Sequence, residues 1–287
     1  MKSISFLYLL LMIALAFSGC APAGSTTMPT QVETPVTSAT SIPPTSTSTF
    51  IPTAIVIPTM PPTLEPEQAK ETIRTLLQQP VDCVAPCFWG IMPGQTTLQE
   101  ASNIFAHLGL QLMHTNTRDN KDFYAVNYNF DDGIEVLVII GIQNNIVQSL
   151  DVGINDTSEV GTPRRWSAYS PETLISRYGS PSRVDFFLGR VAPTPTHSME
   201  MYFKNVKLIV QYIGTNLLNV NFPKLEMCPL TNQVEYIHIW MGDDPRYPPS
   251  PGVPLEEATS LTMEEFSKLM TGDQNKACLN LKEEAFP

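Results

Sequence analysis

The side chains best suited to acid–base or metal chemistry are scattered along this sequence. Its histidines are His107, His114, His197 and His238, and none lies within four residues of another. A zinc helix would place two histidines around a glutamate at helical spacing, and a hydrolase nucleophile elbow would read Gly-x-Ser-x-Gly. Neither pattern occurs, and glycine-rich phosphate loops are also missing from the chain. The sequence therefore predicts no enzyme, no cofactor and no metal site.

Two loops carry charged or aromatic side chains that could form a binding surface. Arg164, Arg165 and Trp166 lie between two predicted structural units, where the indole could face outward as a contact point. Asp243 and Asp244 follow a predicted strand and precede a proline-rich segment. Solvated turns are the alternative for the acidic pair, because loops collect Asp and Gly for backbone reasons. These five residues are the candidate binding residues.

The N-terminus has the layout of a secretory signal. Lys2 is followed by an apolar run over residues 4–17 and then by Ser-Gly-Cys, ending at Cys20. The run has about fourteen residues, whereas a membrane-spanning helix needs roughly twenty. The segment Phe-Ser-Gly-Cys resembles the bacterial lipobox, although Phe17 stands where that motif prefers Leu, Val or Ile. An ordinary signal peptide cleaved after Ala16 is the alternative.

The resemblance to the lipobox implies a lipid on Cys20. In that class of protein the cysteine becomes the new N-terminus and carries a diacylglyceryl group and usually an amide-linked acyl chain such as palmitate. Each buried methylene contributes about 0.8 kcal/mol, so two or three chains hold a protein on a membrane where one would not. We therefore expect a signal peptide over residues 1–19. We also expect a cell-envelope protein, anchored to the membrane through Cys20, with its folded part outside the cytoplasm.

The remaining cysteines are Cys83, Cys87, Cys228 and Cys278. An even number of cysteines in an exported chain indicates disulfides. Three pairings are open, and we favour Cys83 with Cys87 and Cys228 with Cys278. A metal or redox site at the first pair is the alternative. Zinc sites usually need a second closely spaced pair, however, and thioredoxin-type motifs have two intervening residues where this pair has three.

Residues 20–64 are predicted to form a disordered stalk. From Ala21 to Leu64, twelve residues are Thr and nine are Pro, and the only charge is on Glu33. Such a segment cannot bury enough apolar surface to offset its ordering entropy. The stalk would hold the folded part away from the membrane. Its hydroxyl groups would suit O-glycosylation, and a bare spacer is the alternative.

The folded part is predicted to begin at residue 65, with a leading helix over residues 67–78. Thr97 and Glu100 form a capping box, and the apolar spacing after them predicts a helix that Gly109 ends in a left-handed conformation. Strands follow at residues 110–114, 123–130, 134–142 and 146–154. Turn sequences at 131–133 and 144–145 connect the last three as hairpins.

The same order of elements then repeats. Ser170 and Pro171 begin a short helix that ends at Gly179, and strands are predicted at residues 184–188, 199–203, 206–213 and 234–241. A last helix is predicted over residues 263–270. We therefore predict an α+β fold of tandem αββββ units with antiparallel sheets. The units span residues 65–160 and 161–287, and we interpret them as a duplication.

Two segments resemble known exported proteins. Residues 93–97, which begin a helix, and the helix ends at 108–109 and 178–181 resemble small envelope lipoproteins related to the outer-membrane assembly lipoprotein family and to beta-lactamase inhibitor protein. This resemblance implies helices packed on an antiparallel sheet, and the inhibitor has two such units in tandem. Residues 83–91 resemble a sequence motif of uncharacterised exported lipoproteins from Chloroflexi-type bacteria. This resemblance implies no activity.

Charge excludes one class of partner. Seventeen basic and twenty-eight acidic side chains give a net charge of -11, which repels phosphate backbones, so we expect no nucleic acid partner. We expect a binding or protein-interaction module whose partner is an envelope protein or a small ligand. The alternatives are an envelope hydrolase built from Asp243, Asp244 and His238, and a purely structural envelope spacer.

Overall fold

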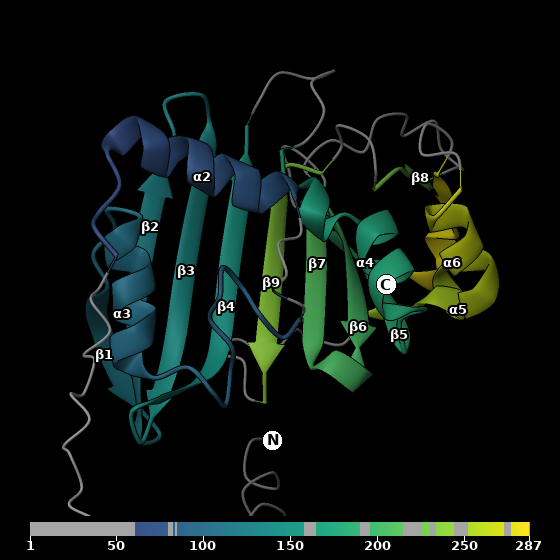
Figure 1. Cartoon of the computed structure of the whole chain (residues 1–287). Coiled ribbons are helices and arrows are strands. Elements are labelled where there is room, and N and C mark those ends of the chain that lie inside the picture. Colours follow the sequence, from purple (N-terminus) through teal and green to yellow (C-terminus); the bar gives the residue numbers. More distant parts are fainter. Residues whose placement is uncertain are drawn as a thin grey trace, which may run out of the picture. The chain divides into compact units, whose positions relative to one another are not determined.

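One large antiparallel sheet organises the protein in the computed structural model (Figure 1). The structure describes residues 61–79, 83, 85–157, 165–189, 196–214, 225–229, 234–243, 252–272 and 277–286. The predicted signal peptide, Cys20 and the predicted stalk as far as residue 60 lie outside the described residues, as do Arg164 and Asp244. Nothing in the structure therefore bears on the predicted lipid anchor.

Five helices are described: α2 (Pro66–Gln78), α3 (Leu98–His107), α4 (Pro171–Tyr178), α5 (Leu255–Ala258) and α6 (Met263–Met270). Short 3-10 turns are η1 (Ser167–Tyr169), η2 (Lys204–Val206) and η4 (Glu283–Ala285). The strands are β1 (Met113–Arg118), β2 (Lys121–Asn129), β3 (Ile134–Gln143), β4 (Ile146–Asp156), β5 (Arg183–Gly189), β6 (Thr196–Phe203), β7 (Leu208–Gly214), β8 (Leu225–Met227), β9 (Tyr236–Gly242), β10 (Val253–Pro254) and β11 (Leu279–Leu281). No helix among the described residues is long and apolar enough to cross a membrane.

The strand order explains how the two predicted units combine. The main sheet runs β1-β2-β3-β4-β9-β7-β6-β5-β10, and β8 pairs with β11 in a separate ribbon. The first unit contributes β1 to β4 and the second contributes β5, β6, β7 and β9, so both follow the predicted αββββ order. Their last strands, β4 and β9, pair antiparallel. The α+β prediction is confirmed, and the units share one sheet.

The period-two alternation of strands gives this sheet one apolar face. Figure 1 shows α2, α3 and α4 in front of that face, which we call the helix face. The hydroxyl of Tyr212 on β7 donates to the carbonyl of Tyr169 in η1 at 2.7 Å, which ties the sheet to the segment that leads into α4. One row of buried side chains on the helix face, in register from β5 to β2, is Val184, Met201, Val210, Ile239, Val152, Val138 and Val126.

The helix ends follow the capping chemistry that the sequence predicts. Thr97 accepts from the backbone N–H of Glu100, and the Glu100 carboxylate accepts from the backbone N–H of Thr97 at 2.8 Å. Ser170 caps α4 with Pro171 in its first turn. These side chains satisfy backbone groups that have no partner within the helix, each worth about 1 kcal/mol.

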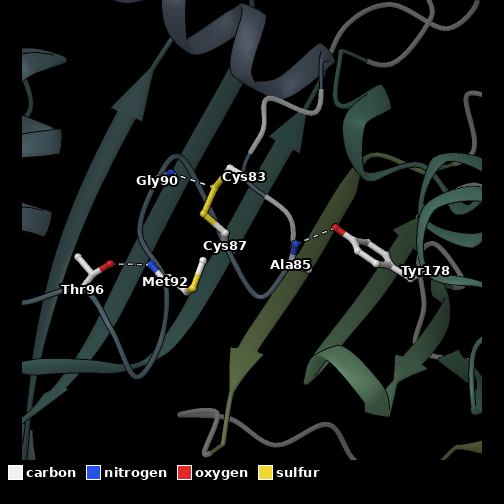
Figure 2. Close-up of a disulfide and its surroundings, with 7 residues drawn as sticks. All are labelled: Cys83, Ala85, Cys87, Gly90, Met92, Thr96 and Tyr178. Carbon is white, nitrogen blue, oxygen red and sulfur yellow. Dashed lines mark hydrogen bonds between the residues drawn. A yellow bond between two sulfur atoms is a disulfide. The ribbon is translucent and has the colours of Figure 1, made fainter.

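A cross-linked segment between α2 and α3 crosses β4 and β9 on the helix face (Figures 1 and 2). Cys83 and Cys87 form a disulfide, and the backbone N–H of Gly90 donates to the sulfur of Cys83 at 3.0 Å. The N–H of Ala85 donates to the hydroxyl of Tyr178 on α4 at 2.8 Å (Figure 2). The segment therefore links helices of both units above the strands where the units meet.

The structure departs from the sequence prediction at the first strand. We expected it at residues 110–114, but β1 begins at Met113 and all six of its residues are exposed. Leu110 and Leu112 instead pack on the core from an irregular segment. The alternation of Leu110 and Leu112 in the sequence therefore reflects packing on the core and not a strand. β1 is an edge strand that pairs only with β2.

Some short elements were not predicted. They are β8, β10, β11 and α5, which have between two and four residues. Segments of this length are too short to carry a hydrophobic period. The Cys228–Cys278 disulfide lies beside the β8–β11 ribbon, where Met227 is opposite Leu279. Both disulfides therefore have the pairing that we favoured from the sequence.

Loss of the two disulfides should have unequal effects on stability. The Cys228–Cys278 bond closes a loop with a sequence separation of 50, and the Cys83–Cys87 bond closes one of 4. On the chain-entropy model the first contributes about 4 kcal/mol and the second about 2 kcal/mol. We expect Cys228→Ala with Cys278→Ala to lower the free energy of unfolding more than Cys83→Ala with Cys87→Ala, as measured by urea denaturation. Equal losses would contradict this ranking.

Candidate functional site

The second face of the sheet carries the polar side chains and is called the polar face here. Among the described elements, α2, α3 and α4 lie on the helix face and α5 and α6 lie beyond β5 (Figure 1). No described helix therefore covers the polar face. Two rows cross it in register. One is Arg183, Tyr202, Ile209, Trp240 and Asp151, and the other is Asp185, Glu200, Gln211 and His238.

Two carboxylates lie directly opposite each other on β5 and β6. Asp185 and Glu200 are both buried, and each has a partner two residues away on its own strand. Arg183 donates from Nε to Oδ1 of Asp185 at 2.8 Å, and its Nη2 forms an ion pair with Oδ2 at 2.7 Å that is too bent for a hydrogen bond. Tyr202 donates its hydroxyl to Oε2 of Glu200 at 2.7 Å. These partners hold Arg183 and Tyr202 in fixed positions.

The two carboxyl groups have different electrostatic surroundings. The pKa of Glu200 is raised to about 7, mainly by burial and further by the neighbouring Asp185, against the opposing effect of the hydrogen bond from Tyr202. Asp185 has Arg183 against it, and the Asp185 carboxylate raises the pKa of that arginine through a hydrogen bond. The site therefore holds one ion pair and one carboxyl group that exchanges its proton near neutral pH.

An aromatic ladder on β9 borders this pair. The ring centroids of His238 and Trp240 are 4.0 Å apart, and those of Tyr236 and His238 are 5.8 Å apart. The Nε2 atom of His238 lies against Oδ1 of Asp151 on β4. An aspartate–histidine pair can orient a general base, but nucleophilic catalysis also needs a hydroxyl or thiol beside the base. Within the described residues the only side-chain hydrogen bond of His238 is to Asp151.

A cavity of about 380 Å³ opens beside these rows, where the β6–β7 hairpin meets the end of β9. We call it the basic-aromatic cavity. Its walls include Arg183, Tyr202, Lys204, Lys207, Trp240 and Asp243. Lys207 Nζ lies 2.5 Å from Oδ1 of Asp243. The volume is within the range of roughly 300–1,000 Å³ that small-molecule sites occupy.

Two other cavities are less suited to an organic ligand. One of about 250 Å³ adjoins the basic-aromatic cavity and shares Lys207 and Asp243 with it. The other lies on the helix face beside the Cys83–Cys87 disulfide and has a volume of about 30 Å³. A water molecule needs roughly 10–15 Å³ by this measure, so the second cavity has room for one or two waters. The basic-aromatic cavity is the best candidate site in the described part of the chain.

The predicted contact loop at Arg164, Arg165 and Trp166 is not an outward-facing surface where it is described. Trp166 is 3% exposed, and its ring centroid lies 6.0 Å from that of Tyr212 on the helix face. The prediction that Trp166 faces outward was therefore wrong, because the large apolar area of an indole favours burial against the sheet. Arg165 Nη2 lies 2.9 Å from Oδ1 of the fully buried Asp156. Its role is to neutralise that carboxylate.

The other predicted residues are separated by the fold. Asp243 is exposed and lines the basic-aromatic cavity. The side chain of His238 is instead hydrogen-bonded to Asp151. Trp240 is buried on the polar face, opposite Asp151 in the strand register. The sequence analysis missed Arg183, Asp185, Glu200 and Tyr202. Their i, i+2 spacing within two strands was the available signal, since such residues share a face.

A metal site has no clear support among the described residues. Only Glu226, Cys228 and Cys278 bring three ligand atoms within 4.8 Å of one another there. Both cysteines are in a disulfide, and a disulfide sulfur has no thiolate to offer a metal. The carboxylates of the polar face do not form such a group.

Comparisons with protein-family models, with curated proteins and with solved structures found no match for this chain. The geometry of the site is therefore the basis for the function proposed below.

The raised pKa of Glu200 predicts a pH-dependent stability. The ordinary glutamate pKa is 4.5 and that of folded Glu200 is about 7. Between these values the unfolded chain has lost the proton and the folded chain keeps it, so stability falls as pH rises through this window. One pKa unit is worth about 1.4 kcal/mol, and solvent screening reduces the full shift to about 2 kcal/mol. We expect Glu200→Gln to remove this loss, as measured by urea denaturation at pH 5 and pH 7.5.

His197 also makes stability depend on pH, but it does not affect the comparison of wild type with Glu200→Gln. Burial lowers the pKa of His197 to about 4, which destabilises the fold as pH falls below 6.5. Both proteins keep His197, so its effect cancels in the difference between wild type and Glu200→Gln. A difference that does not change with pH would contradict the assignment of the raised pKa to Glu200.

Removal of the Arg165 side chain should destabilise the fold strongly. Arg165→Met would remove the ion pair and the side-chain hydrogen bonds that Arg165 makes with the buried Asp156 carboxylate, and breaking a buried pair typically costs about 3–5 kcal/mol. Arg118→Met is a matched control, because Arg118 pairs with Asp119 on the exposed β1–β2 turn. Exposed pairs contribute at most about 1 kcal/mol. Chemical denaturation that gave equal losses for both variants would contradict a structural role for Arg165.

Proposed function

We propose that this protein is a lipid-anchored binding module of the cell envelope and that it takes its ligand in the basic-aromatic cavity. The observation that carries the proposal is the convergence of fixed polar and aromatic side chains on a cavity of about 380 Å³. Ligand sites typically combine an apolar wall with a few placed polar groups. Tyr202 and Trp240 supply the aromatic wall, and Arg183 and Lys207 supply charge.

The chemistry of the chain supports an extracytoplasmic location for this module. Two disulfides close the described domain, and disulfides persist in oxidising compartments. The sequence before the domain resembles a lipoprotein signal that ends at Cys20, followed by the Thr- and Pro-rich stalk. The proposal therefore assigns anchoring to the lipid on Cys20, reach to the stalk and binding to the polar face.

A hydrolase remains the second candidate because Asp151 and His238 are in contact. The hydrolase site that we predicted from the sequence, which includes Asp243 and Asp244, has less support. Asp243 pairs with Lys207 beyond the end of β9, and Asp244 lies outside the described residues. Binding is favoured because His238 has no hydroxyl or thiol hydrogen-bonded to it among the described residues.

The anchor can be tested by metabolic labelling in the native host. An alkyne analogue of palmitate should label the full chain, and Cys20→Ser should abolish the label and release the protein from the membrane fraction. Cys83→Ala with Cys87→Ala is the control, because it removes cysteines that the disulfide already occupies. Label that survives Cys20→Ser would contradict lipidation at this residue.

The binding role can be tested by filling the cavity. Ile209 lines the basic-aromatic cavity, and Ile139 lies in the same row of the polar face on β3, opposite Asp151. We expect immobilised full chain to retain a compound from envelope extract that mass spectrometry detects in wild type and Ile139→Trp. Ile209→Trp should retain at least tenfold less. Equal retention by all three proteins, or none by any, would contradict a ligand site in this cavity.

A further inference from the structure

The charge of the basic-aromatic cavity is opposite to that of the whole chain. The protein has a net charge of -11, yet Arg183, Lys204 and Lys207 line this cavity and Asp243 is its one acidic lining residue. Lys204 and Lys207 are both exposed. A cluster of cations on an acidic protein concentrates the electrostatic attraction for anions at that place.

The cations are only partly neutralised by the protein itself. Arg183 uses Nε and Nη2 on Asp185, and Lys207 pairs with Asp243. Lys204 forms no ion pair within the described residues. Since a lysine ammonium has three N–H donors and a guanidinium has five, an incoming acid group can bond to the donors that Asp185 and Asp243 do not use. The cavity therefore has positive charge available to a ligand.

The aromatic wall of the cavity, formed by Tyr202 and Trp240, favours a ligand with a flat ring. The guanidinium carbon of Arg183 lies 5.3 Å from the centroid of the Tyr202 ring, and the hydroxyl of Tyr202 is held by Glu200. Trp240 on β9 lies two strands further, with Ile209 of β7 between them in the row, and the ring centroids of Trp240 and His238 are 4.0 Å apart. These rings are fixed by contacts at their edges and faces, so a ligand ring can pack on them with little loss of side-chain entropy.

The size of the cavity limits the ligand further. A volume of about 380 Å³ is far more than a phosphate or sulfate needs and is near the lower end for organic ligands. This volume has room for one or two rings with an attached acid group, and it is too small for a folded partner.

We infer that the basic-aromatic cavity binds a ring-bearing organic anion, with its ring against Tyr202 and Trp240 and its acid group at Lys204 and Lys207. This inference rests on the proposed function, because it names the chemical class of the ligand for the same cavity. Asp243 holds Lys207 at the rim, and Arg183 lies against the ring of Tyr202.

Two matched fluorescent probes test the class of ligand on the full chain. One is 8-anilinonaphthalene-1-sulfonate, and the other is N-phenyl-1-naphthylamine, which has the same rings without the sulfonate. We expect the anionic probe to bind at one saturable site at least tenfold more tightly than the neutral probe. Tighter or equal binding of the neutral probe, or no saturable binding of the anion, would overturn the inference.

Substitution of the two lysines tests where the acid group of the anionic probe binds. Lys204→Gln with Lys207→Asn should weaken the anionic probe about tenfold and leave the neutral probe unchanged. Lys207 has a φ of 50°, which asparagine tolerates, so the turn is retained. Lys268→Gln with Lys282→Gln is the control, with the same change in net charge on the C-terminal part of the chain. Near-ultraviolet circular dichroism verifies that each variant is folded.

The outcomes separate this inference from the proposed function. If the lysine variants bind the anionic probe as wild type does, the anion assignment is wrong. The retention experiment with Ile209→Trp still decides whether the cavity binds any ligand. If Ile209→Trp retains the extracted compound as well as wild type does, the proposed function fails as well.

Discussion

The pairing of β4 with β9 is the contact on which the rest of the structure depends. Each αββββ unit alone would leave its last strand at an open edge, with unpaired backbone groups. Joining the two edges in register aligns Val152 with Ile239 and makes one continuous apolar surface from strands of both units. The Cys83–Cys87 segment and Trp166 then cover that surface, which is why these residues are structural.

The same register determines the chemistry of the other face. Because side chains alternate, every strand that buries valine or isoleucine on the helix face presents the intervening residues on the polar face. Asp151, Asp185 and Glu200 are buried there, and a buried carboxylate needs a partner or a proton. His238, Arg183 and Tyr202 are those partners. Since these partners hold each other in place, the walls of the basic-aromatic cavity are already organised before a ligand arrives.

Prediction from the sequence succeeded where the signal was local. The capping box at Thr97, the left-handed Gly109 and the turn at Asn144 depend on neighbours in the chain, and the structure has them. The site was mostly missed because its residues come from four strands and the hairpin between β6 and β7. Glu200 acquires its raised pKa only from burial and from Asp185 on the next strand, and neither is visible from its own neighbours in the chain. Trp166 was misplaced because its burial depends on Tyr212, far along the chain.

The sequence by itself determined the α+β class and the repeated order of elements, which follow from spacing within short windows. It favoured one of three disulfide pairings, and its resemblance to a lipobox led to the expectation of an exported, lipid-anchored chain. Only the tertiary structure decided that the two units share one sheet, and that three cationic and three aromatic residues of an acidic protein line one cavity. The reason is that strand register across β5, β6, β7 and β9 sets which residues are neighbours, and register is fixed by packing of the whole sheet.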